Sequence, residues 1–163
     1  MPNPNDAVMP ATSPVAEPAP RRRALLAACG AHAVHDGLTD LIYVLLPIWQ
    51  VQFGLSYAQI GVVRGAWSAT MAAFQLLASR AARRFGRERL LIGGTVLIGV
   101  AYLLAGQAGG LIALLAALVL GGLGASTQHP LASSLVSDTH EPGAPVKQAL
   151  SHYNFAGDIG KTL

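Results

Sequence analysis

The apolar residues of this chain fall into long stretches that are separated by short polar segments. Four stretches are long enough to cross a lipid bilayer as α-helices, and a fifth is cut off before it can span. Between Leu90 and Ser126 the clearly polar side chains are Thr95, Tyr102, Gln107 and Ser126 itself, too few for the surface of a soluble protein. The pattern predicts an all-α membrane protein with helices at residues 24–49, 57–79, 90–106 and 111–134, and a truncated fifth helix at 148–163.

The first 23 residues lack this pattern. Six of the ten prolines lie in residues 1–20, without apolar periodicity, a composition typical of disorder. Arg21, Arg22 and Arg23 follow, and basic residues next to a membrane helix stay on the cytoplasmic side. We expect a disordered cytoplasmic tail at residues 1–23 and an incomplete amino-terminal transmembrane half at 24–163.

A basic connector separates the second and third apolar stretches. Residues 80–89 hold five arginines and a single acid, Glu88, an excess that places the connector in the cytoplasm. Segments 50–56 and 107–110 lie on the other side by alternation, and they contain no lysine or arginine. Because both flanks of the connector are apolar, we expect no nucleic-acid partner. The predicted location is a bacterial-type inner membrane, with several spans and a cytoplasmic amino terminus.

Composition and length agree with this interpretation. Hydrophobic residues make up 52% of the chain and charged residues 12%, against about a quarter charged in soluble domains. Cys29 is the single cysteine, which excludes an internal disulfide. Because 163 residues hold four spans and the start of a fifth, we expect a truncated product or fragment.

Ionisable side chains inside the predicted helices are the candidates for chemistry. His32, Asp36 and Asp40 recur at intervals of four on one helix face, and such residues normally face a bundle interior or a water-filled cavity. We expect Asp36 or Asp40 to carry a proton, with Arg64 as the partner of whichever stays charged. The alternative is that both acids form fixed structural pairs, with Arg64 and with a basic group in the missing half. The candidate set for proton coupling or the substrate path is completed by Gln128, His129, Asp158 and Lys161.

Metal and enzyme chemistry are the weaker interpretations. His32, His35 and Asp36 lie on adjacent turns, but nothing in the sequence shows the convergence of three or four ligands that zinc needs. We expect neither metal nor cofactor. No arrangement of nucleophile, base and oxyanion donors is visible, so we do not expect an enzyme. The run from Ser126 to Pro130 is interpreted as a broken helix that lines a substrate path.

The cytoplasmic connector carries a recognisable motif. Its residues 83–87, RRFGR, match the core D-R-x-G-R of a family signature in all but the first position, and on this ground the chain resembles the amino-terminal part of a major facilitator superfamily transporter. The stretches HDGLTDLIYVLLPIWQ, GASTQHPLAS and NFAGDIGK are most similar to the branch that includes fosmidomycin-resistance type drug exporters. The resemblance implies a cytoplasmic gating loop at Arg83, Arg84, Gly86 and Arg87.

Two positions depart from the family pattern. Arg83 stands where the signature has aspartate, and Leu118 stands where the family has an arginine in its fourth helix. The resemblance therefore implies neither the cytoplasmic latch formed by that aspartate nor proton coupling through that arginine.

The expected architecture is the first four transmembrane helices, and the start of a fifth, of a 12-helix transporter fold. The expected function is proton-coupled export or exchange of a small organic molecule. Its partners would be the substrate, protons, the lipid bilayer and the missing carboxy-terminal helices. The alternative is a non-transporting membrane remnant, or a helix-bundle partner that needs a separately encoded remainder.

Overall fold

The computed structural model describes residues 19–140 and 143–162, and all of its regular structure is helical. The all-α prediction is confirmed. Of the predicted disordered tail at residues 1–23, residues 1–18 lie outside the described part of the chain, whereas residues 19–23 are helical, which corrects that boundary. The six helices are α1 (Ala19–Phe53), α2 (Tyr57–Phe85), α3 (Arg87–Gly106), α4 (Leu111–Ala125), α5 (Gln128–Thr139) and α6 (Ala144–Thr162).

α1 is longer at both ends than the predicted 24–49, and it continues through Pro47. It ends where Gly54 takes a positive φ of 60°, a conformation that glycine adopts without steric cost. Ser56 then caps α2. Its hydroxyl accepts from the backbone of Gln59, while the Gln59 side chain accepts from the Ser56 backbone, so two otherwise unsatisfied donors are paired reciprocally. The outer turn is therefore shorter than the predicted segment 50–56.

The basic connector is mostly helical, which corrects the prediction of a loop at residues 80–89. α2 runs to Phe85 and α3 begins at Arg87, so Gly86 alone joins them, with φ 89° and ψ 141°. Since that φ favours glycine, the two helices meet in a tight corner at this residue. The arginines consequently stand on the ends of two helices.

The predicted helix at 111–134 is divided into α4 and α5 by a break at Ser126 and Thr127. The hydroxyls at the break bond backwards, Ser126 to the Leu123 carbonyl at 2.7 Å and Thr127 to the Gly124 carbonyl at 3.0 Å. The Gly124 carbonyl also accepts from the Thr127 amide at 3.3 Å, so side-chain and backbone donors together satisfy carbonyls at the interruption. α6 also begins earlier than predicted, at Ala144.

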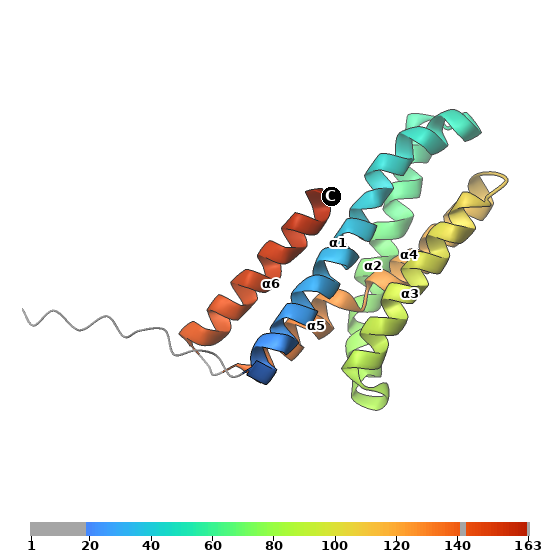
Figure 1. The fold of residues 1–163 in the computed structure, drawn as a ribbon. Coiled ribbons are helices and arrows are strands. Elements are labelled where there is room, and N and C mark those ends of the chain that lie inside the picture. Colours follow the sequence, from blue (N-terminus) through green and yellow to red (C-terminus); the bar gives the residue numbers. More distant parts are fainter. Residues whose placement is uncertain (1–18, 141–142, 163) are drawn as a thin grey trace, which may run out of the picture.

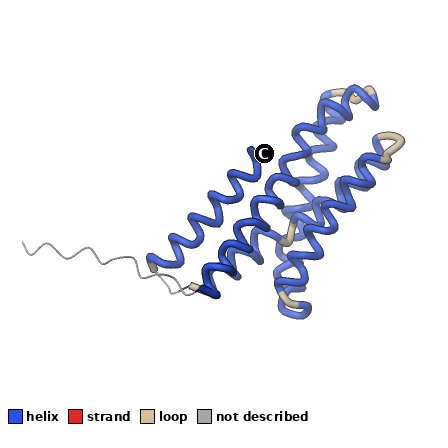
Figure 2. The backbone as a smooth tube through the Cα atoms, viewed as in Figure 1, coloured by secondary structure: helices blue, strands red, loops and turns tan. Residues whose placement is uncertain are grey.

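The helices form one bundle in which successive long helices run in opposite directions (Figures 1 and 2). The turns after α1 and α3 lie at one end, and the corner at Gly86 lies at the opposite end. α6 lies beside α1 and runs parallel to it. α4 packs between α2 and α3.

Small residues allow these close approaches. A Cβ on Gly94 would lie 2.6 Å from the Gly124 carbonyl oxygen, and a Cβ on Gly124 would lie 2.6 Å from that of Gly94. Gly121 leaves room for the ring of Trp67, which is 2% exposed. Close backbone contact of this kind is how helices associate in lipid, where no hydrophobic effect drives them together.

Two of the described helical stretches, Arg87–Gly106 and Leu111–Thr139, are long and apolar enough to cross a membrane. The outer surface of α3 is apolar, with Ile92 and Leu103 each more than 60% exposed. α1 is also long, but His32, His35, Asp36 and Asp40 lower its hydropathy. Most of these polar groups belong to the site described next.

Candidate functional site

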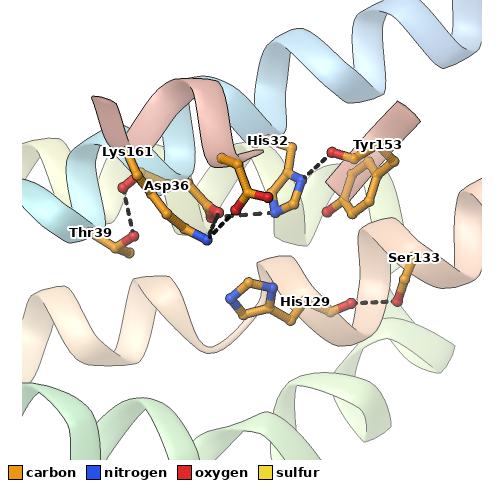
Figure 3. A network of polar contacts seen from close by, with 8 residues as sticks. His32, Asp36, Thr39, His129, Ser133, Tyr153 and Lys161 are labelled. Carbon is orange, nitrogen blue, oxygen red and sulfur yellow. Dashed lines mark hydrogen bonds and ion pairs between the residues drawn. The ribbon is translucent and has the colours of Figure 1, made fainter. Parts of the chain in front are cut away.

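A buried cluster of ionisable side chains lies where α1, α5 and α6 meet (Figure 3). α1 contributes His32 and Asp36, which are one helical turn apart and are 3% and 2% exposed. α5 contributes His129, and α6 contributes Tyr153 and Lys161. The structure therefore brings together predicted residues that are more than 90 positions apart in the sequence.

The contacts of the two ring nitrogens of His32 indicate which of them carries a proton. Nδ1 lies 2.8 Å from the carbonyl oxygen of Tyr153, and a carbonyl only accepts, so Nδ1 carries a proton. Nε2 lies 3.3 Å from Oδ1 of Asp36. If the ring were neutral and the carboxylate charged, two acceptors would face each other. A further proton, on His32 or on Asp36, would let one of these two atoms donate to the other.

The second carboxylate oxygen of Asp36 faces a lysine. Nζ of Lys161 lies 3.4 Å from Oδ2 of Asp36 and 3.0 Å from Oδ1 of Asp158. Asp36 is buried, whereas the Lys161 and Asp158 side chains are 43% and 69% exposed. Lys161 thus connects a buried acid to an open surface.

α6 reaches His32 and Asp36 because it presents a glycine there. A Cβ on Gly157 would lie 2.6 Å from Cε1 of His32 and 2.7 Å from Oδ2 of Asp36. One turn earlier, the Tyr153 ring stacks on the His32 ring with centroids 3.9 Å apart and planes at 7°. Tyr153 and Gly157 together hold the His32 ring in place.

Two further histidines border the pair. His129 is exposed, and its ring meets those of His32 and His35 edge to face, with centroids 5.8 and 6.0 Å apart. His35 is 1% exposed, and neither ring nitrogen has a hydrogen-bond partner among the described residues. His129 therefore contacts both buried imidazoles and is itself accessible to solvent. Within the described residues, no group of three histidine, cysteine or acidic side chains is placed to hold a metal ion.

The structure places Arg64 away from this cluster, which corrects the expected pairing with Asp36 or Asp40. The Arg64 guanidinium donates to the hydroxyls of Tyr43 and Ser68. Asp36 is paired with His32 and Lys161 instead. Asp40 is half-buried, and no ion pair joins it to another described residue. The two acids that the sequence left equivalent are thus in different environments.

Gln128 is 2% exposed at the start of α5, directly after the break in the fourth predicted helix. The break is thus lined by a polar side chain that is costly to bury. This arrangement agrees with the interpretation of residues 126–130 as a broken helix.

At the corner between α2 and α3, the arginines of the predicted gating loop at residues 83–87 are in different environments. Arg83 and Arg84 are exposed, and Arg84 lies over the ring of Phe85. Arg87 instead binds across the bundle, to Oδ2 of Asp138 at 2.6 Å and to the Ser134 hydroxyl at 3.0 Å. It therefore ties the start of α3 to the second half of α5.

Sequence reasoning missed several of these partners. Asp138 lies beyond the predicted helix at residues 111–134, although α5 continues to Thr139. Gly157 and Tyr153 were not singled out as site residues. The sequence feature that could have identified them is the four-residue spacing of Tyr153, Gly157 and Lys161, which places all three on one face of α6. Helical periodicity alone does not say which neighbour that face meets.

Comparison with known proteins places the chain in a family. The model of the Major Facilitator Superfamily matches residues 28–163. The multidrug transporter mfsC of Aspergillus fumigatus, itself named for this superfamily, is 30% identical over 128 residues, which is 77% of this chain and 25% of that protein.

Two further relatives are bacterial. The cephamycin export protein CmcT of Amycolatopsis lactamdurans is 29% identical over 128 residues, which is 78% of this chain and 26% of that protein. The probable sulfoacetate transporter SauU of Cupriavidus necator is 33% identical over 92 residues, which is 56% of this chain and 21% of that protein. The chain thus spans about a quarter of the length of these relatives. No solved structure matches. The family match covers most of the chain, including the α1, α5 and α6 cluster, and the chain belongs to the Major Facilitator Superfamily.

Proposed function

We propose that these residues form the amino-terminal part of a secondary transporter that exports or exchanges a small organic molecule against protons. The relatives are named as transporters or as an export protein, which supports a transport role. Because the chain spans about a quarter of their length, the proposed pathway requires further helices. We propose a plasma membrane of bacterial type as the location, with residues 83–87 on the cytoplasmic side as part of a gate.

The observation that carries proton coupling is the pair of His32 and Asp36. The pair can accept a proton between Nε2 of His32 and Oδ1 of Asp36, it is buried, and it contacts the exposed ring of His129 and the half-exposed amine of Lys161. A carboxylate whose proton is exchanged as solvent access alternates couples proton movement to conformation. Of the two acids proposed from the sequence, Asp36 is the better supported because Asp40 has no such partners in the part of the chain that the structure describes.

A test uses the chain joined to the remaining helices of its transporter in inside-out vesicles. A pH gradient is established, and its dissipation is followed with an acridine dye as a panel of organic compounds is added. We expect at least one compound to dissipate the gradient and Asp36→Asn to abolish this response. His152→Gln is the matched control, because His152 is exposed on α6 and outside the cluster. Coupling that persists in Asp36→Asn would remove the assignment.

The competing role, a non-transporting partner in a helix bundle, predicts a different outcome. In that case no compound would dissipate the gradient with any variant, although the protein would still insert and fold. Helix content in the vesicles, measured by circular dichroism, checks the folding.

A further inference from the structure

We propose that Arg64, Tyr43 and Ser68 form a binding site for the anionic group of a small organic molecule, a carboxylate, sulfonate or phosphonate. This inference deepens the proposed transport function and rests on it for its biological meaning. The site is separate from the proton-binding pair, since it is built by α1 and α2, whereas the pair lies between α1, α5 and α6.

The guanidinium of Arg64 is held on two sides. One terminal nitrogen donates to the hydroxyl of Tyr43 at 2.6 Å, and the other donates to the hydroxyl of Ser68, one turn further along α2. The guanidinium carbon also lies 4.8 Å from the centre of the Tyr43 ring, a distance at which a cation is attracted to the aromatic face. Arg64 is therefore positioned before any ligand arrives.

These contacts leave most of the donor capacity unused. A guanidinium has five N–H groups in a planar fork, and the two described hydrogen bonds use two of them. The three that remain suit the two oxygens of a carboxylate or similar group, which arginine binds through parallel hydrogen bonds. The partners found in the structure are neutral, so they orient the charge without cancelling it.

The charge of Arg64 has no acidic counterpart in the described part of the chain. Asp36 is engaged by His32 and Lys161, Asp158 by Lys161 and Asp138 by Arg87, while Asp40 lies outside ion-pair distance. Arg64 is seven residues into α2 and half-buried. A charge within a membrane helix is normally paired because leaving it unpaired is costly. The position therefore favours an incoming anion.

The setting suits an organic anion better than a simple ion. The Tyr43 side chain is 53% exposed, so its ring offers an apolar surface beside the charge. Tyr43 is seven residues from Asp36 on α1, two turns along the same face, or about 10 Å. An anion at Arg64 and a proton at the His32 and Asp36 pair would thus occupy one side of one helix.

The test measures binding and arginine protection on the purified chain in a maltoside detergent, which carries no phosphate. The probes are two aromatic anions, benzoate and benzenesulfonate, and an aromatic cation of similar size, benzyltrimethylammonium, serves as the control. Each is titrated into the chain and its binding is measured by calorimetry. In parallel, phenylglyoxal modification of Arg64 is followed by mass spectrometry of peptides. We expect both anions to bind and to protect Arg64, and the ammonium to do neither.

Variants separate the site from general electrostatics. Arg64→Gln should weaken anion binding by about tenfold or more, since it removes charge-assisted hydrogen bonds. Arg64→Lys should retain part of the binding because the charge is kept. Arg80→Gln is the control, as Arg80 is an exposed arginine of the same helix, and it should bind as the unmodified chain does. Circular dichroism confirms that each variant is helical.

Three outcomes would overturn the proposal. The first is equal anion binding by the unmodified chain and by folded Arg64→Gln, and the second is no anion binding by the unmodified chain. The third is protection of Arg64 without added anion, either in phosphatidylcholine nanodiscs, which would identify lipid phosphate as its partner, or in the chain joined to its remaining helices, which would identify a carboxylate there. None of these measurements uses a proton gradient, so they fail or succeed independently of the transport test.

Discussion

At the scale of single residues, the chemistry of the buried cluster depends on the hydrogen bond between His32 and the carbonyl of Tyr153. This bond places a proton on Nδ1 and leaves Nε2 to face Asp36 at 3.3 Å. The other α1 acid, Asp40, has no comparable partner within residues 19–140 and 143–162. Sequence spacing predicted that both acids share a face with His32, and it could not distinguish them, because the discriminating groups come from α6.

This hydrogen bond predicts the tautomer of His32. In the purified chain labelled with ¹⁵N, the neutral form of His32 should carry its proton on Nδ1, since the Tyr153 carbonyl accepts from that nitrogen. The measurement is the ¹⁵N chemical shift of the two ring nitrogens. His152, which is exposed, should show the mixture of tautomers found in water. A dominant Nε2–H tautomer at His32 would contradict the geometry.

At the scale of helices, the approach of α6 to α1 depends on glycine. A Cβ on Gly160 would lie 1.9 Å from the Ala33 carbonyl oxygen, and one on Gly37 would lie 2.9 Å from the Gly160 carbonyl oxygen. Because both contacts involve backbone atoms, neither can be relieved by a change of rotamer. The same contacts bring Lys161 to Asp36, so packing and the proton site are linked.

Gly160→Ala should therefore destabilise the chain by about 1–3 kcal/mol, the usual cost of overpacking a close contact. The measurement is the denaturant midpoint in mild detergent. Gly99→Ala is the matched control because an added Cβ meets nothing within 4 Å there, and alanine favours helix over glycine. Equal stabilities of the two variants would show that α6 does not pack on α1 as described.

Element boundaries were the less predictable part of the fold. The capping box at Ser56 and Gln59 can be read from sequence, and the start of α2 was predicted at the observed residue. The connector at 80–89 was expected to be a loop because of its charge, but arginine is a good helix former, and α2 continues until Gly86. The division at Ser126 and Thr127 was signalled by polar residues, although its position depends on contacts with α3.

At the scale of the whole molecule, the helices alternate in direction, with two turns at one end of the bundle and the Gly86 corner at the other (Figure 1). The arginines of the corner indicate the cytoplasmic side. The family assigned from the sequence is confirmed, whereas the fosmidomycin-resistance type branch and the side of the membrane stay predictions.

The orientation predicts which end of the bundle is accessible from outside the cell. With Cys29 replaced by serine, single cysteines at Gln52 and Gly109, which are exposed, should react in intact cells with a maleimide that does not cross membranes. Arg84→Cys, at the opposite end, should react only after the cells are permeabilised. The reverse pattern of labelling would invert the topology.

The sequence by itself determined the helical class and the set of polar residues inside the bundle, because apolar run length and periodicity are local properties of the chain. The family was indicated by resemblance, through the motif at residues 83–87 and three further stretches. Only the tertiary structure decided which of those polar residues meet. In the structure, Asp36 pairs with His32 and Lys161, whereas Arg64 donates hydrogen bonds to Tyr43 and Ser68. The physical reason is that these contacts depend on how closely two helices approach and at what register, which is set by small residues such as Gly157 and Gly160 across an interface.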